Sequence, residues 1–224
     1  NNPFFTGLLA VIIVFVGVKI PFLSLPYYWD EAWVYGPAIR TMEATKLGIL
    51  PDSLPPELSR GHPLLFHFLG AVWMKLFGTT VTSGHLFALL ISVLLLVAVY
   101  FFGKKIFLSP KAGFTAAFVL AMQPVFLAQS GLLLPEVMLA LFSLLTFYFY
   151  LDNKRVLYVI AGILTLFTKE SGLIVIATLL LWTLLETLFS DDGKKWKKFF
   201  VRSLVIALPL LPFIAYFVYQ NMII

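Results

Sequence analysis

The chain has no cysteine and few charged residues, and both absences narrow what it can be. Without cysteine it can form no disulfide framework, thiolate nucleophile or zinc-thiolate site. Charged residues make up only 12% of the 224 residues, whereas hydrophobic residues make up 61% and the mean hydropathy is +0.97. A soluble domain cannot bury that much apolar surface, so the composition indicates an integral membrane protein.

Several familiar catalytic and binding motifs are also absent. The sequence contains no P-loop, no dinucleotide fingerprint, no His-x-x-x-His metal pattern and no Ser-His-Asp order. The net charge of +5 is modest, and the densest basic stretch, 190–202, is typical of a cytoplasmic loop that contacts anionic lipid. We therefore expect membrane lipid, and no nucleic acid, as a partner.

Seven apolar stretches have the character of membrane-spanning helices, which predicts an all-α integral membrane fold. The predicted spans are 4–25, 81–103, 112–129, 134–151, 155–169, 171–189 and 203–222. No repeat or second domain is evident in the sequence. We interpret residues 1–224 as a single transmembrane module, with the character of the N-terminal part of a longer chain.

The segment 63–78 is apolar but only 16 residues long, and it decides how the chain is threaded. If it lies in the membrane interface, ten basic residues fall on one side of the membrane, which is typical of a cytoplasmic face. These are Lys104, Lys105, Lys111, Lys154, Arg155, Lys194, Lys195, Lys197, Lys198 and Arg202. Residues 27–80 then form the first external loop, with juxtamembrane helices at 63–78 and within 31–47.

Two adjacent carboxylates, Asp30 and Glu31, follow the first span within an aromatic run from Tyr27 to Trp33. A carboxylate at an apolar membrane exit can orient a polar substrate and remove its proton, which a membrane anchor does not require. The alternative is that Asp30 only caps the next helix, although no Glu or Gln follows three residues later to complete a capping box. We predict that both residues are catalytic.

The external loop closes with Arg60, Gly61 and His62. Arginine offers a planar fork for phosphate oxygens, histidine offers a second donor, and glycine permits close backbone approach. This pattern predicts a phosphate-binding turn. The alternative is that His62 and Pro63 merely cap and begin a helix.

Three further charged residues interrupt apolar sequence on the same predicted side of the membrane. Glu136 begins the fourth span, and Lys169 and Glu170 separate two spans without a loop. We predict that all three line a substrate cavity. The alternatives are a helix-dipole role for Glu136 and a mutual ion pair between Lys169 and Glu170. We expect His67, His85 and Glu186 to be structural.

The order of these motifs resembles the GT-C membrane glycosyltransferases, and most closely the protein O-mannosyltransferase and aminoarabinose (lipid A) transferase branch. The resemblance rests on Asp-Glu after the first helix, His-Pro opening a segment that ends Lys-Leu-Phe-Gly, Pro-Glu at a later helix start, and Thr-Lys-Glu-Ser-Gly. It covers nearly the whole chain. Two positions depart from the family pattern, because Leu64 replaces a frequent second proline and Glu136 replaces the usual aspartate.

The resemblance implies a seven-span module with an active site on the extracytoplasmic side, which moves a sugar from a polyprenyl-phosphate donor to a lipid, protein or glycan acceptor. Asp30 matches the family's base and Glu31 its neighbour. The segment from Arg60 to Pro63 matches the donor-phosphate region, Glu136 the second acidic site and Lys169 a cavity cation. Attack opposite the phosphate would invert the anomeric carbon. The spacing requires no metal or other cofactor, although several carboxylates could hold a divalent ion.

Two other functions stay open from the sequence. One is a non-catalytic membrane subunit or transporter fragment that binds a lipid or anion through Arg60, His62 and Lys169. The other is an enzyme of a different reaction, such as a polyprenyl-phosphate flippase partner or a ligase.

Overall fold

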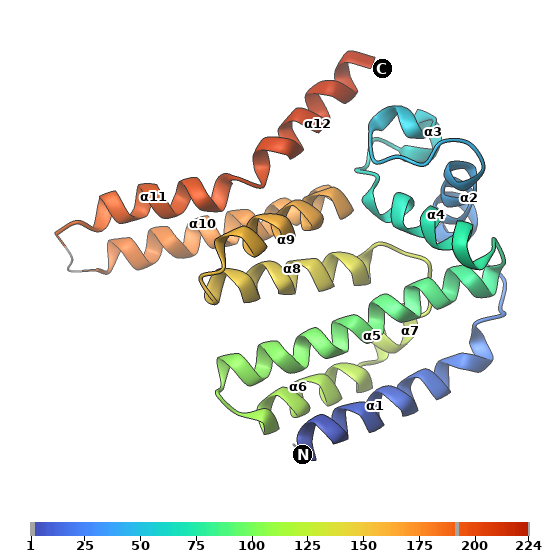
Figure 1. Cartoon of the computed structure of the whole chain (residues 1–224), viewed down its shortest axis with the longest axis horizontal. Coiled ribbons are helices and arrows are strands. Elements are labelled where there is room, and N and C mark those ends of the chain that lie inside the picture. The colour runs from blue at the N-terminus through green and yellow to red at the C-terminus, as the bar shows by residue number, and fades with distance from the viewer. Residues whose placement is uncertain (1–2, 191–192, 224) are drawn as a thin grey trace.

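A computed structural model describes residues 3–190 and 193–223, and within these residues the protein is helical without any strand. Figure 1 shows an array of helices that run roughly side by side, with shorter helices gathered at one end. The array consists of α1 (Pro3–Lys19), α5 (Val81–Ile106), α6 (Pro110–Met122), α8 (Glu136–Leu151), α9 (Arg155–Thr168) and α10 (Leu173–Leu188). The closest packing joins α5 to α6 and α8, and α8 to α9.

The two ends of this array differ in charge and structure. One end, here called the loop end, carries α2 (Gly36–Ala44), α3 (Pro56–Ser59) and α4 (Leu65–Phe77). The opposite end, here called the basic end, carries the α5–α6 and α8–α9 connections and the start of α11 (Lys195–Ala207). The ion pair between Lys105 and Asp152 joins the ends of α5 and α8 there, and Lys154, at the start of α9, pairs with the same carboxylate. The ten basic residues that the sequence groups on one face thus come from this end of the array.

Helix length separates clear candidate spans from shorter apolar helices. Three stretches are long and apolar enough to cross a membrane, namely Pro3–Phe22, Val81–Ile106 and Glu170–Leu188. A fourth arises if α11 and α12 (Leu210–Ile223) form one bent span. Helices α6, α8 and α9 have 13, 16 and 14 residues, fewer than the roughly 20 that cross a 30 Å hydrocarbon core without help. The fold is therefore all-helical and apolar, and the count of seven spans stays a prediction.

The predicted span 112–129 is wrong as one continuous helix. The chain breaks at Gln123, whose ψ of 124° is extended, and α7 (Pro124–Gln129) starts anew. Pro124 has no N–H to donate to the preceding turn, and its ring disfavours helical backbone at the residue before it.

The predicted span 203–222 is also wrong in its boundaries. Helix α11 begins at Lys195, so 195–202 is helix rather than loop; residues 191–192 lie outside the described residues. The helix ends at Ala207, and α12 continues after a bend of 46°. Pro209 at this bend removes a backbone donor and packs against α9, where a Cβ at Gly162 would lie 2.7 Å from its ring.

The predicted external loop folds into short helices that pack on one another. Helix α4 has 13 residues and lies within the predicted segment 63–78. It buries Phe66, Ala71 and Met74, and α2 buries Ile39 and Met42 against it. The two helices approach closely because a Cβ at Gly70 of α4 would lie 2.8 Å from the Ile39 side chain. This packing gives the loop end a fixed shape on which the polar residues are arranged.

Candidate functional site

The loop end begins with a turn of π-helix, η2 (Glu31–Tyr35). Pro37 cannot donate a backbone hydrogen bond, and the Gly36 N–H bonds the carbonyl oxygen of Glu31, five residues earlier. A Cβ at Gly36 would lie 2.5 Å from that oxygen and 2.9 Å from the Tyr27 ring. Only glycine fits there, so the Gly36-Pro37 pair accounts for the wide turn. Such turns are frequent at functional sites.

Asp30 occupies the N-cap position of η2, yet its side chain makes no capping hydrogen bond. The residue is exposed, and the neighbouring Trp29 and Trp33 expose 70% and 78% of their surface. Trp29 also has a left-handed backbone with φ of 50°, which is uncommon for a bulky residue. The capping alternative is therefore not realised, and Asp30 is an accessible carboxylate between exposed aromatic rings.

Glu31 lies in the opposite environment, with only 1% of its surface exposed. One carboxylate oxygen, Oε1, accepts the Leu133 N–H at 2.5 Å and lies 3.1 Å from His85 Nε2. The other oxygen accepts the Tyr28 N–H at 3.2 Å, and His85 Nδ1 lies 2.9 Å from the Leu23 carbonyl oxygen. The buried Glu31 carboxylate thus ties η2 to α5 and to the segment that leads into α8. The two predicted catalytic carboxylates do not share one environment.

Two ion pairs join residues from the α3–α4 turn, α8 and the α9–α10 junction. His62 Nδ1 lies 2.9 Å from Glu170 Oε2, and Lys169 Nζ donates to Glu136 Oε1 at 2.8 Å. The mutual pair between Lys169 and Glu170 is not formed, because the extended backbone at Lys169 (φ −161°, ψ 141°) sends the two side chains to different partners. All four side chains keep between 27% and 42% of their surface exposed, so a ligand can reach them.

Tyr35 lies within electrostatic range of Asp30 and of residues from both ion pairs. Its ring is mostly buried, and burial is the largest cause that raises the pKa of Tyr35, to about 12. The carboxylates of Glu136, Asp30 and Glu170 raise it further and Arg60 opposes them, which places all four within electrostatic reach of the Tyr35 hydroxyl. The hydroxyl therefore keeps its proton at neutral pH and can donate a hydrogen bond.

We call this group of residues the loop-end cluster. Its members are Asp30, Tyr35, Arg60, His62, Glu136, Lys169 and Glu170. Six of the seven predicted site residues belong to it, and the buried Glu31 lies beside it. Tyr35 was not predicted as a site residue. The Gly36-Pro37 sequence that follows it was the available signal, because it stands directly after the wide π turn, six residues after Asp30.

The turn at Arg60 and Gly61 has a left-handed backbone at both residues, with φ of 51° and 76°. A non-glycine residue with this backbone is uncommon and is often kept at ligand-binding positions. Arg60 is exposed, and α12 lies beside the turn, where a Cβ at Gly61 would come within 3.8 Å of Gln220 Nε2. Helix α4 begins only at Leu65, so His62 does not serve as the start of a helix.

His67 of α4 packs beside Tyr35, and from the sequence we expected it to be structural. Its ring centre is 5.6 Å from that of Tyr35, and the residue is 2% exposed. Burial, and next the charge of His62, lower the pKa of His67 to about 4, so the imidazole is neutral at physiological pH. Among the described residues neither ring nitrogen has a hydrogen-bond partner, and no three His, Asp or Glu side chains are grouped to hold a metal ion.

A profile of the dolichyl-phosphate-mannose-protein mannosyltransferase family matches residues 61–218, which is more than half of the chain. The matched range contains His62, Glu136, Lys169 and Glu170, and it begins directly after Arg60. No curated protein and no solved structure matches the chain.

Proposed function

The chain belongs to the dolichyl-phosphate-mannose-protein mannosyltransferase family of GT-C membrane glycosyltransferases, and on this basis we propose that it moves a sugar from a polyprenyl-phosphate donor to an acceptor outside the cytoplasm. The observation that best supports the proposal is the loop-end cluster, in which four separate segments bring together an exposed carboxylate, a neutral hydroxyl and the cations of Arg60 and Lys169. A membrane anchor has no need for such a group.

The donor leaves as a phosphate, so the site needs cationic donors where negative charge develops. Arg60 is exposed on its left-handed turn and offers a planar fork for two phosphate oxygens. Lys169 supplies a second cation, held in place by Glu136. We assign the donor phosphate to Arg60 and Lys169, with His62 fixed beside them by Glu170.

Asp30 is the residue to which we assign the base. It takes the proton from the acceptor hydroxyl or amine as the acceptor atom bonds to the anomeric carbon, and the bond from that carbon to the phosphate oxygen breaks. Attack from the face opposite the phosphate inverts the carbon. Glu31 does not face the substrate, since it is buried and has three partners. We assign it the role of holding the π turn that carries Asp30.

We place the basic end in the cytoplasm and the loop end on the extracytoplasmic side, following the positive-inside rule. In this threading α4 lies in the membrane interface, since its 13 residues extend only about 20 Å. The shorter helices α6, α8 and α9 then complete seven crossings together with the longer ones. Such short spans require local thinning of the bilayer or burial of their ends by neighbouring helices.

The function is tested with purified protein and labelled polyprenyl-phosphate sugars. The transferase should release polyprenyl phosphate only when an acceptor is present, whereas a non-catalytic lipid-binding subunit would bind donor without consuming it. An acceptor that cannot cross the membrane should support the reaction in right-side-out vesicles and not in inside-out vesicles. Release of polyprenyl phosphate that does not depend on the acceptor, or that occurs only in inside-out vesicles, would contradict the proposal.

The same assay tests the phosphate assignment. Arg60→Ala should weaken donor binding about 10- to 100-fold, because a hydrogen bond to a charged group contributes about 1.5–3 kcal/mol. Arg60→Lys should recover only part of the loss, since the planar fork is missing. Arg40→Ala is the matched control, because Arg40 lies over the Tyr27 ring at 5.4 Å outside the loop-end cluster. Equal donor affinity in the Arg60→Ala and Arg40→Ala variants would move the phosphate elsewhere, first to Lys169.

A further inference from the structure

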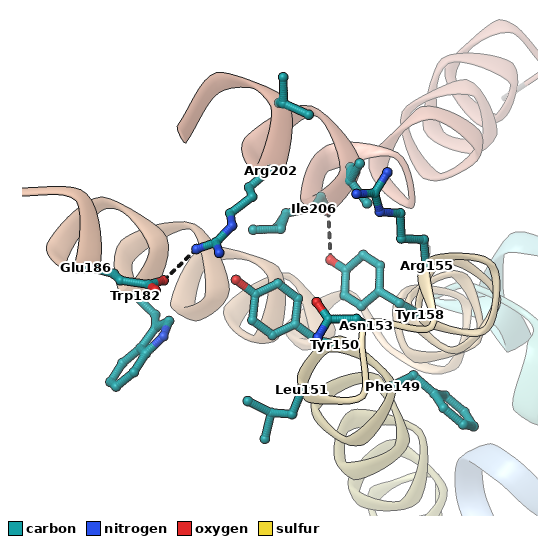
Figure 2. Close-up of a pocket in the computed structure, with 12 residues that line it drawn as sticks. Phe149, Tyr150, Leu151, Asn153, Arg155, Tyr158, Trp182, Glu186, Arg202 and Ile206 are labelled. Atoms are coloured by element: carbon teal, nitrogen blue, oxygen red, sulfur yellow. Dashed lines mark hydrogen bonds and ion pairs between the residues drawn. The ribbon is translucent and has the colours of Figure 1, made fainter. Parts of the chain in front are cut away.

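A separate cavity lies at the basic end, far along the helices from the loop-end cluster. It has a volume of about 250 Å³ and opens between α8, α9, α10 and α11. Its polar lining comes from α8, α9, α10 and α11, with Arg155 at the start of α9 and Arg202 on α11; Figure 2 shows both arginines with the other lining side chains. This volume is below the roughly 300–1,000 Å³ of pockets that hold drug-sized ligands. The cavity therefore suits a small group such as a lipid headgroup.

The charges in the cavity favour an anion. Arg202 Nη1 donates to Glu186 Oε2 at 2.8 Å, which fixes the guanidinium and leaves its other N–H groups available. No ion pair engages the Arg155 side chain within the part of the chain that the structure describes, and that side chain is exposed. Two arginines against one carboxylate leave a net positive lining, within the most basic region of the protein.

The remaining lining is held rigidly. Tyr158 is buried and donates its hydroxyl hydrogen to the Ile206 carbonyl oxygen at 2.9 Å, which fixes α9 against α11. Tyr150 and Thr183 join their hydroxyls at 2.9 Å, which fixes α8 against α10. The two arginines therefore project from helices that side-chain hydrogen bonds already hold together.

The outer border of the cavity has the character of a membrane interface. Trp182 exposes 61% of its surface and Val201 exposes 49%, next to the exposed apolar surface of α11. Exposed tryptophan beside arginine is typical of the level where headgroups meet acyl chains, and basic pockets between membrane helices bind anionic lipid headgroups. An acyl chain could follow the apolar border while the headgroup enters the polar part.

We propose that this cavity binds the phosphate of an anionic phospholipid, between Arg155 and Arg202, on the membrane side that faces the basic end. The lipid would fasten α11 to α9 and α10 at the point where the chain turns toward the bend before α12. This site differs from the donor site in position and in ligand, and it does not depend on the transfer reaction.

The test uses the purified full chain in detergent, titrated with phosphatidylglycerol, phosphatidylcholine or inorganic phosphate, and read by native mass spectrometry and by the thermal midpoint of unfolding. Phosphatidylglycerol should bind and raise the midpoint, and the other two should not. Arg155→Gln and Arg202→Gln should each weaken that binding about tenfold or more. The matched control is the double change Lys111→Gln and Lys197→Gln, which removes two exposed basic charges at the same end but outside the cavity lining.

Each outcome decides the proposal. Loss of phosphatidylglycerol binding in the arginine variants but not in the control supports it. Equal loss in the control would mean that only general positive charge attracts the lipid, and equal binding of inorganic phosphate would make this an anion site without lipid specificity; either result overturns the proposal. Arg155→Gln keeps the test valid if Arg202→Gln fails to fold, because that change breaks no ion pair described for the chain.

Discussion

Replacement of Asp30 by asparagine should leave the protein folded and able to bind donor, yet reduce sugar transfer about 10²- to 10⁴-fold, the usual contribution of a general base. Asparagine has nearly the same size and caps helices equally well, but it cannot accept a proton at neutral pH. Because the Asp30 side chain makes no capping hydrogen bond, its loss should hardly change stability. The measurement is the rate of acceptor-dependent donor consumption at saturating donor.

Asp52→Asn serves as the matched control for this change. Asp52 is an exposed carboxylate in the same predicted external loop, and it pairs with Lys46 at 2.5 Å outside the loop-end cluster. The control variant should transfer sugar at the wild-type rate. If Asp30→Asn and Asp52→Asn were equally active, Asp30 would not be the base, and Glu136 would become the next candidate because its second oxygen has no hydrogen-bond partner among the described residues.

Removal of the Glu31 side chain should instead destabilise the fold. Glu31→Ala leaves the Leu133 and Tyr28 N–H groups and the buried His85 ring without their common partner. Leaving a buried hydrogen-bonding group without its partner costs about 1–3 kcal/mol for each group. Unfolding in mixed micelles measures this loss, and Asp52→Ala, which breaks an exposed pair, should cost only about 0–1 kcal/mol.

Stability and activity measurements together separate a positioning role of Glu31 from a catalytic one. If Glu31 stabilises the fold through its contact with His85, the loss in unfolding free energy of the Glu31→Ala, His85→Ala double variant should be clearly smaller than the sum of the losses in the two single variants. Transfer activity per folded molecule should fall less in Glu31→Gln than in Asp30→Asn. A Glu31→Gln protein that is fully stable yet as inactive as Asp30→Asn would show that Glu31 takes part in the reaction itself.

Much of the helical layout follows from hydropathy and charge in the sequence. The predicted spans 4–25, 81–103 and 171–189 match stretches that are long and apolar enough to cross a membrane. The basic residues gather at one end because each short connection that carries them joins neighbouring antiparallel helices. Hydropathy averages over a window, however, and it does not register a single proline. This explains why the breaks at Pro124 and Pro209 were missed.

The sequence allowed us to predict that these residues lie near one another, but not which partner each of them takes. Their positions at helix starts and junctions on one predicted side implied that they meet. Adjacency in sequence gave no sign that Asp30 faces outward while Glu31 is buried, since that depends on the contacts of Glu31 with α5 and Leu133, which is 102 positions away. Sequence adjacency also gave no sign that Lys169 and Glu170 pair with different residues. The extended backbone at Lys169 points the two side chains in different directions.

The most direct test of the central claim, that donor binds at the loop-end cluster, is photo-crosslinking with a polyprenyl-phosphate sugar that carries a photoreactive group beside its phosphate. Crosslinks are expected in the peptides that contain Arg60 to Pro63 and Lys169 to Glu170, and they should be suppressed by excess unlabelled donor and reduced in Arg60→Ala. Crosslinks concentrated instead in the peptides that contain Arg155 and Arg202 would place the donor at the basic end and show that it does not bind at the loop-end cluster.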